Sequence, residues 1–293
     1  MVSVWSMVFM AVAALVCVAV PAAGMIVLAT RKASDGTRAH LHLWRPFLCG
    51  ALAFFVSQVL TRLPLMAAVV PRLPEPISGF LLSAPVASYT AGLFEETGRL
   101  VVMILLLKGF HRFVDGVAFG LGHGGLEAVL LVGLSTVSNI GLAVVINSGQ
   151  WSSVAASMPP EVAQQMFKAL TTTPPATFLL GGVERVAAVV LHVCCSLLVL
   201  WGVHAGRRLL AWAVAVLVHG SFNLVAVLLA PRMSLYLVEA LLLVLAAALA
   251  TIAWRSRHRF APRLEPPAVP APAAAGPMPP SAPGGPVPTE RDV

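Results

Sequence analysis

Charged residues are scarce in this sequence: Asp, Glu, Lys and Arg make up only 11% of its 293 residues. A soluble domain has about 25% of these residues. Hydrophobic residues account for 58% of the chain, and the mean hydropathy is +0.89. One water-soluble core of this size cannot bury so much apolar surface, so the surrounding solvent must be lipid. The composition therefore excludes a soluble enzyme, a nucleic-acid-binding protein and a secreted disulfide-bonded domain.

Cysteine and lysine are also rare, and their positions exclude further classes. The cysteines lie in or beside apolar runs and form no CxxC motif; they are Cys17, Cys49, Cys194 and Cys195. A free thiol in such a run behaves as a small hydrophobic group, so we expect no disulfide framework. The lysines all fall between the apolar runs; they are Lys32, Lys108 and Lys168. No lysine inside a span is therefore available for a retinal Schiff base.

Long apolar runs are what the sequence has in abundance. About 20 apolar residues cross a bilayer as a helix. Such runs cover approximately residues 1–30, 47–70, 77–108, 113–147, 175–203, 209–230 and 233–254. A more polar segment, 148–173, separates two of them, and we expect a short amphipathic helix there at about 161–170. The pattern predicts an all-α polytopic membrane bundle of about seven transmembrane helices, placed in the cell membrane.

The basic residues predict the orientation of these spans. With seven spans, one side receives most of them, namely Arg31, Lys32, Arg38, Arg45, Lys108, Arg112, Arg207, Arg208, Arg255, Arg257, Arg259 and Arg263. The other side receives Arg62, Arg72, Lys168 and Arg232. Because basic residues are enriched in cytoplasmic loops, we expect the N-terminus outside and the C-terminus in the cytoplasm. The first run meets no basic residue before Arg31, which favours a retained helix over a cleaved signal peptide.

The composition changes sharply after Phe260. Residues 261–293 are dominated by Pro, Ala and Gly and show no apolar periodicity. We therefore divide the chain into a helical bundle, 1–255, that contains the site and a disordered cytoplasmic tail, 261–293.

The fourth run, 113–147, is longer than a membrane requires. As one straight helix it would measure about 52 Å, against a hydrocarbon thickness of about 30 Å. It also contains Gly116, Gly120 and Gly124 at a spacing of four. The glycines indicate either a face for close helix packing or a thinned or broken helix that gives access to a cavity.

Ionisable side chains within the apolar runs are the main indication of function. Each costs about 2.5–3.5 kcal/mol on the insertion scale and usually faces a bundle interior or a wet cavity. The polar residues in question are Glu95, Glu96, Arg99, His123, Glu127, Glu184, Arg185, His192, His219, Asn223 and Glu239. Such a concentration is too costly to be without a role.

Several of these residues share one predicted depth. Glu96, His123, His192 and His219 each lie eleven or twelve residues from the expected cytoplasmic end of their run. At 1.5 Å per residue, all of them would lie about 16–18 Å below that surface. The sequence thus predicts a glutamate and imidazoles from different helices around one cavity, with Glu184 nearer the outer face.

Spacing within each run adds expected pairs. Glu95 and Arg99 are four residues apart, so one carboxylate can pair with this guanidinium while Glu96 faces elsewhere. His219 and Asn223 repeat this spacing and can jointly hold a water, a metal or an oxyanion. His123 and Glu127 repeat it again, as a ligand with its orienting partner would.

The motifs that contain these residues resemble those of the YhfC family. They are Phe94-Glu95-Glu96-Thr97-Gly98-Arg99, Gly122-His123-Gly124-Gly125-Leu126-Glu127-Ala128, Glu184 with His192, and His219-Gly220-Ser221-Phe222-Asn223. The family is placed among glutamic-type intramembrane proteases, related to PrsW and the CAAX prenyl endopeptidases. The EExxR spacing is closer to PrsW, so a CAAX substrate preference is not carried over.

The resemblance implies a catalytic set of Glu95, Glu96, His123, His219 and Asn223. In our hypothesis, Glu96 or Glu95 takes a proton from water and returns it to the leaving amine, and His123 positions the water. His219 and Asn223 stabilise the oxyanion.

We expect Arg99, Glu127, Glu184 and His192 to support this site. Two or three of the imidazoles of His123, His192 and His219 with a glutamate can form a zinc site that has an open position. A glutamate base needs no ion, and the sequence does not choose between the two.

The function that the sequence predicts is endopeptidase cleavage of a membrane-associated protein or peptide, without any nucleic-acid partner. The alternatives are a proton- or ion-coupled transporter, in which buried Glu, His and Arg form the pathway, and a haem protein with two histidine ligands.

Overall fold

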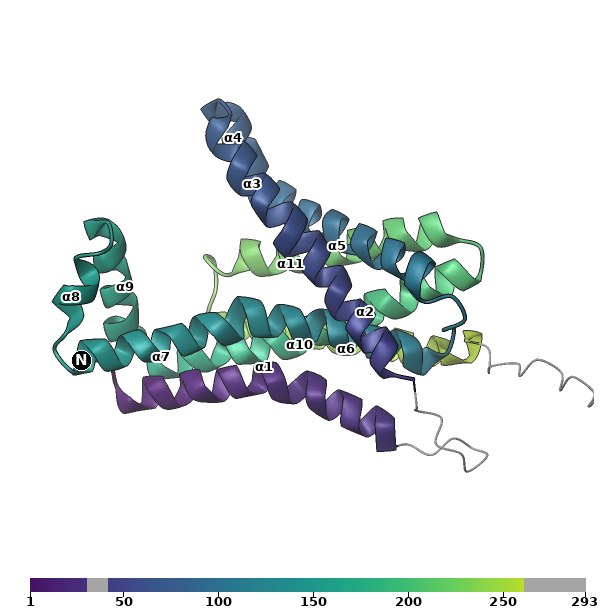
Figure 1. The fold of residues 1–293 in the computed structure, drawn as a ribbon, viewed down its shortest axis with the longest axis horizontal. Helices are drawn as coiled ribbons and strands as arrows, with labels where there is room; N and C mark the ends of the chain where they lie inside the picture. Colours follow the sequence, from purple (N-terminus) through teal and green to yellow (C-terminus); the bar gives the residue numbers. More distant parts are fainter. Residues whose placement is uncertain (31–41, 261–293) are drawn as a thin grey trace, which may run out of the picture. The chain divides into compact units, whose positions relative to one another are not determined.

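The computed structural model describes residues 1–30 and 42–260 and shows only helices in that part of the chain. The first half contains α1 (Val4–Thr30), α2 (Trp44–Phe54), the π-helical segment η1 (Phe55–Arg62), α3 (Leu63–Val69), the 3-10 turn η2 (Val70–Arg72), α4 (Glu75–Leu82), α5 (Ala84–Leu106), α6 (Phe113–Glu127), the π-helical segment η3 (Ala128–Gly133) and α7 (Leu134–Asn147). The second half contains α8 (Trp151–Ala155), α9 (Pro160–Thr172), α10 (Pro175–His204), α11 (Arg208–Leu229), α12 (Leu235–Arg255) and the 3-10 turn η4 (Ser256–Arg259). The all-α fold is confirmed (Figure 1).

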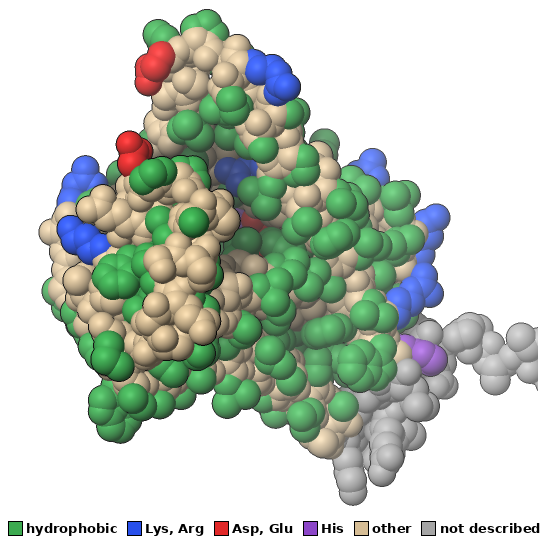
Figure 2. Space-filling view, turned by 60° about the vertical axis from the view of Figure 1, so that its left-hand side comes forward, with side chains coloured by type: hydrophobic (Ala, Val, Ile, Leu, Met, Phe, Trp, Pro, Cys, Tyr) green, Lys and Arg blue, Asp and Glu red, His purple; other side chains and the backbone are tan. Residues whose placement is uncertain are grey.

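Six helices of the described residues are long and apolar enough to cross a bilayer, and a bent helix pair raises the number to as many as seven. They are Val4–Thr30, Trp44–Arg72, Phe113–Asn147, Pro175–His204, Arg208–Leu229 and Leu235–Arg259, with Glu75–Leu82 and Ala84–Leu106 as the bent pair. Large apolar side chains cover much of the surface, as Figure 2 shows for one face. The chain is a multi-pass membrane protein, and the sidedness of its termini stays a prediction.

The expected third span, 77–108, is not one straight helix. α4 and α5 meet at an angle of 64° around Ser83, whose backbone is extended at φ −60° and ψ 147°. Pro85 lies in the first turn of α5, where a missing N–H costs nothing. A helix continued through Pro85 would lack its hydrogen bond to residue 81 and would clash with that turn. The proline therefore sets the bend.

The long fourth run forms one continuous helix, Phe113–Asn147, with the π-helical turn η3 in its middle. Its glycines serve close packing. A Cβ on Gly120 would lie 2.3 Å from the backbone of Val193, and one on Gly124 would lie 3.0 Å from the backbone of Val189, both in α10. The packing interpretation is therefore the correct one, and the space beside these glycines is filled by a neighbouring helix.

α6 and α10 are the helices around which the bundle is assembled. α6 packs against α1, α2 and α10, while α10 also packs against α1, α5, α11 and α12. α5 in turn packs against α2 and α11. This arrangement brings α5, α6, α10 and α11, which are far apart in the sequence, to one place (Figure 1).

The polar segment between α7 and α10 contains the expected amphipathic helix. α9 buries Ala163 and Leu170, and the ring of Phe167 lies 5.7 Å from that of Trp151 in α8. Nearby, Asn147 at the end of α7 accepts a hydrogen bond from the backbone of Val2 at 2.7 Å. The predicted disordered tail, 261–293, lies outside the described residues, and the division into bundle and tail stays a prediction.

A methyl group at position 120 should destabilise the bundle. We expect Gly120→Ala to lower the free energy of unfolding by about 3 kcal/mol, because backbone atoms of α10 would have to move. Gly141→Ala is the matched control: a Cβ there meets open space, and alanine is the better helix former by about 1 kcal/mol. Thermal unfolding in detergent measures both variants. Equal unfolding temperatures would show that α6 and α10 are not in close contact.

Candidate active site

Four helices place buried polar side chains at one point inside the bundle. α5 contributes Glu95, Glu96 and Arg99, while α6, α10 and α11 contribute an imidazole each. The imidazoles are those of His123, His192 and His219. All of these side chains are at least 96% buried. The structure thus brings together the double glutamate and the histidines that the sequence places at one depth.

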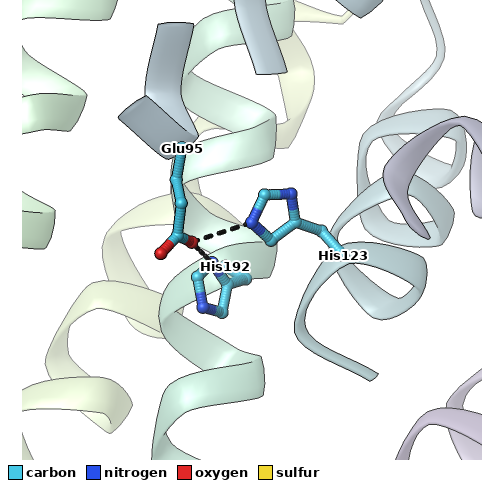
Figure 3. Close-up of side chains that lie close together, drawn as sticks. All are labelled: Glu95, His123 and His192. Atoms are coloured by element: carbon cyan, nitrogen blue, oxygen red, sulfur yellow. Dashed lines mark hydrogen bonds and ion pairs between the residues drawn. The ribbon is translucent and has the colours of Figure 1, made fainter. Parts of the chain in front are cut away.

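The carboxylate of Glu95 lies at the centre of the imidazoles (Figure 3). Its Oε2 lies 2.9 Å from His123 Nε2 and 4.0 Å from His192 Nδ1. The same oxygen lies 3.9 Å from His219 Nε2. Its other oxygen, Oε1, accepts a hydrogen bond from the side-chain amide of Gln58 at 2.5 Å. Glu95 is therefore held by one neutral donor and turned toward three ring nitrogens.

Glu96 is the partner of Arg99, which corrects the pairing of Arg99 with Glu95 suggested by their spacing of four. Arg99 Nε donates to Glu96 Oε2 at 2.8 Å, and Nη2 donates to Oε1 at 3.1 Å. A spacing of three also brings side chains together on a helix, and the two-pronged geometry suits a carboxylate. The two glutamates thus have different environments, one cationic and one lined by imidazoles.

Arg99 also fixes α10 against α5. Its Nη1 donates to the backbone carbonyl of His192 at 2.9 Å and to the hydroxyl of Ser196. Its Nη2 lies 3.1 Å from His192 Nδ1. Because a guanidinium can only donate, this Nδ1 must carry a lone pair.

The remaining histidine contacts fix two tautomers. His192 Nε2 contacts the carboxylate of Glu127, so the ring proton belongs on Nε2 and leaves Nδ1 bare. His219 Nδ1 lies 2.8 Å from Glu96 Oε1, so its proton belongs on Nδ1 and leaves Nε2 bare. A carboxylate that orients an imidazole in this way is typical of metal sites and of proton-transfer sites.

Glu127 therefore orients His192, which corrects the expected pairing with His123. His123 and Glu127 do share the face of α6 that looks at α10, but the glutamate reaches across to the other helix. The Nδ1 of His123 has no hydrogen-bond partner among the described residues. Its ring lies against Phe54, with centroids 5.5 Å apart.

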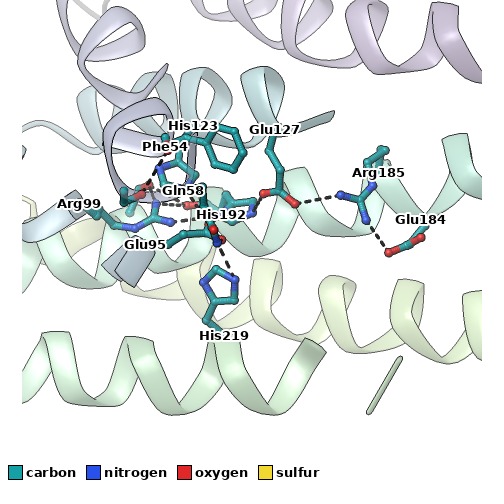
Figure 4. A network of polar contacts seen from close by, with 12 residues as sticks. Phe54, Gln58, Glu95, Arg99, His123, Glu127, Glu184, Arg185, His192 and His219 are labelled. Carbon is teal, nitrogen blue, oxygen red and sulfur yellow. Dashed lines mark hydrogen bonds and ion pairs between the residues drawn. The ribbon is translucent and has the colours of Figure 1, made fainter. Parts of the chain in front are cut away.

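A chain of ion pairs leads from His192 away from the cluster (Figure 4). Glu127 accepts a hydrogen bond from Arg185 at 2.9 Å, and Arg185 also pairs with Glu184. The side chain of Glu184 is 37% exposed, whereas those of Arg185 and Glu127 are largely buried. Glu184 thus acts on the cluster only through Arg185 and Glu127.

Asn223 is the predicted site residue that the structure leaves without a contact. It follows His219 by one turn of α11 and is half-buried. Its amide forms no hydrogen bond within the described part of the chain. The amide is therefore available to a bound molecule.

Gln58 and Ser196 belong to the site but were not found from the sequence. Gln58 lies in the π-helical segment η1, and Ser196 holds a nitrogen of Arg99. π-Helical turns are rare and frequent at functional sites. The sequence signal for Gln58 is a polar amide at the centre of an apolar run.

The cluster has the donor chemistry of a metal site. Ligand atoms of Glu95, His123 and His192 all lie within 4.8 Å of one another. Glu95 Oε2 lies 2.9 Å from His123 Nε2 and 4.0 Å from His192 Nδ1, on either side of the roughly 3.3 Å that separates ligands of tetrahedral zinc. Imidazole and carboxylate donors suit zinc and other first-row divalent ions. The residues present therefore fit such an ion.

Similarity to known proteins assigns the family. Residues 17–243 match the family model described as YhfC intramembrane metalloprotease. The chain belongs to the YhfC family. It is also 36% identical over 234 residues to the uncharacterized membrane protein YhfC of Bacillus subtilis (strain 168), which covers 78% of this chain and 86% of that protein. No solved structure matches the chain.

Membership in the YhfC family confirms the resemblance seen in the sequence motifs. The matched residues, 17–243, contain every residue of the cluster. The family description names an intramembrane protease, the predicted class of enzyme, and adds the metal that the sequence left open. A buried Glu-His-His group that could hold a metal agrees with this description.

The amide of Gln58 should matter for the site more than for the fold. We expect Gln58→Leu to weaken zinc binding or peptide cleavage by about 10- to 100-fold, because Glu95 Oε1 loses its donor. Zinc titration against a competing chelator and a cleavage assay measure the two effects. Thr61→Val is the control, since Thr61 is exposed in the same segment and bonds only to Val56. Equal losses in both variants would refute a special role for Gln58.

Proposed function

We propose that this protein is a metal-dependent intramembrane endopeptidase. The observation that carries the proposal is the convergence of Glu95 Oε2, His123 Nε2 and His192 Nδ1 inside a membrane-spanning bundle. These residues would hold the ion, and Arg99 Nη2 would then give up its contact with His192 Nδ1 and keep its hydrogen bond to Glu96 Oε1. A divalent ion held by these groups supplies Lewis-acid chemistry to a carbonyl oxygen and to water. The substrate is a membrane-associated protein or peptide.

His219 is the group that moves the proton in this proposal. Its Nε2 is bare and lies 3.9 Å from Glu95 Oε2, so it can take a proton from a water that attacks beside this carboxylate. The same nitrogen then returns the proton to the nitrogen of the leaving amine. Glu96 Oε1 accepts a hydrogen bond from His219 Nδ1–H at 2.8 Å. This carboxylate stabilises the ring when it becomes positively charged.

This proposal differs from the sequence-based hypothesis, in which Glu96 or Glu95 takes the proton from water, His123 positions the water and His219 stabilises the oxyanion. Both oxygens of Glu96 already accept hydrogen bonds from Arg99. Glu96 is thereby suited to orient His219, and Glu95 to hold the ion. The two carboxylates stay catalytic residues of the site, but neither is the group that takes the proton.

Asn223 completes the proposed site as an oxyanion donor. Its half-buried amide lies one turn from His219 and is not used by the described residues. The amide can therefore donate to the oxygen that becomes negative when water attacks the carbonyl.

Glu127 positions His192 in this proposal, and Arg185 with Glu184 positions Glu127. Such outer partners keep a ligand nitrogen aimed at the ion.

Substrate access follows from the depth of the cluster. The reacting groups are buried, so a helical substrate must unwind to present an extended peptide bond. Figure 2 shows a hollow among hydrophobic side chains, with a basic and an acidic side chain inside it. A hollow of this kind would admit a segment from the lipid.

The haem alternative is disfavoured by the spacing of the rings. The centroids of His123 and His192 are 4.7 Å apart, and those of His192 and His219 are 5.1 Å apart. A porphyrin cannot lie between rings in such contact.

Metal removal and a set of substitutions test the proposed roles. We expect a chelator to abolish peptide cleavage and zinc to restore it. Glu95→Gln and His192→Gln should lose both bound zinc and cleavage. His219→Gln should retain the zinc and lose about 10²- to 10⁴-fold in cleavage rate, because it lacks only the proton-transfer group. Metal analysis of the purified protein together with a peptide-cleavage screen measures both properties.

Glu239→Gln is the control, since Glu239 is a buried carboxylate of α12 outside the cluster. This variant should keep both zinc and cleavage. Full cleavage by metal-free protein would overturn the metal mechanism. Substrate flux across sealed vesicles without peptide cleavage would favour the transporter instead.

A further inference from the structure

A cavity with a volume of about 610 Å³ lies between α10, α11 and α12. α10 packs closely against both of the other helices, whereas α11 and α12 make few contacts with each other. The splayed pair leaves a space over α10. Its walls are formed by apolar residues of all three helices, namely Leu197, Leu198, Trp201, Val214, Val218, Leu249, Ile252 and Ala253.

The mouth of this cavity is basic. The short turn η4 continues directly from α12, and Arg255, His258 and Arg259 line the cavity and are exposed. The guanidinium of Arg259 lies 5.9 Å from the ring of Trp201. Among the described residues, no acidic side chain lines the cavity. The site thus combines an apolar interior with cationic groups at one end.

We propose that this cavity binds one anionic phospholipid. An acyl chain fits the apolar walls, and the phosphate fits the guanidinium groups of Arg255 and Arg259. The apolar interior alone would accept any lipid. The cationic mouth selects for a negative headgroup, since each basic residue near a membrane surface contributes about 1 kcal/mol to binding of anionic lipid.

The other large cavity of the described residues provides an internal comparison. It has a volume of about 550 Å³ and lies between α1, α2 and α6. No charged residue lines it. A lipid bound in the cavity between α1, α2 and α6 would not be selected by its headgroup. A measured preference for an anionic headgroup would therefore indicate binding in the cavity at α12.

The two arginines also differ from their neighbour Arg257. Arg257 lies in the same turn, but its guanidinium stacks on Trp254 at 4.5 Å and donates to the carbonyl of Trp254 at 3.0 Å. It does not line the cavity. Arg257→Gln therefore removes the same charge from the same turn without touching the proposed site.

Retention of phospholipid by the full chain tests the proposal. The delipidated protein in detergent is mixed with equal amounts of phosphatidylglycerol and phosphatidylcholine, and native mass spectrometry counts the lipid that it keeps. We expect the protein to retain one molecule of phosphatidylglycerol in strong preference to phosphatidylcholine. The double substitution Arg255→Gln and Arg259→Gln should lower that preference about 25-fold, or about fivefold for each arginine. Ala253→Phe should reduce retention by filling the cavity.

Three results would overturn the proposal. One is equal retention of the two lipids by the parent protein, and another is no retained lipid at all. The third is an equal loss of preference in Arg257→Gln, because a general basic surface would then explain the binding. Because none of these residues contacts Glu95 or the imidazoles, the result is independent of the peptidase assay.

Discussion

Arg99 is completely buried, and each nitrogen of its guanidinium has an acceptor in Glu96, Ser196 or the backbone and ring of His192. A charge within a bilayer is tolerated only when it is paired and its hydrogen bonds are satisfied. Arg99 meets this requirement by joining α5 to α10, which fixes how the two helices are turned. The positions of Glu95 and His192 both follow from that rotation. One structural ion pair thus sets the geometry of the groups that are proposed to bind the ion.

Much of the site could be predicted from the sequence, because an ionisable group in an apolar run is costly wherever it lies. Depth along each helix follows from residue count, and this was enough to bring Glu96, His123, His192 and His219 together. Partners could not be predicted in this way. Spacing identified the correct helix faces for Arg99 and Glu127, but each pairs with a different group from the one expected. Which of several nearby groups a long side chain reaches depends on helix rotation and on the neighbouring helix.

The two π-helical segments are the part of the fold that the sequence concealed. η1 contains Gln58, and η3 begins directly after Glu127. A π turn forms hydrogen bonds from residue i to i+5 instead of i+4, so the pattern of faces shifts at that point. A prediction that assumes 3.6 residues per turn therefore assigns the residues after a π turn to the wrong helix face. The length and the glycines of the run 113–147 left a thinned or broken helix open as an alternative, but the run is one continuous helix that contains η3.

Charge balance explains why this cluster is suited to a cation. Glu96 is neutralised by Arg99, and Glu127 by Arg185, which leaves the carboxylate of Glu95 with the neutral amide of Gln58 and the imidazoles. A metal ion among the atoms around Glu95 would balance this charge. In the proposed function each ligand nitrogen must be free of its proton, so the affinity for metal should rise with pH until the ligands are deprotonated.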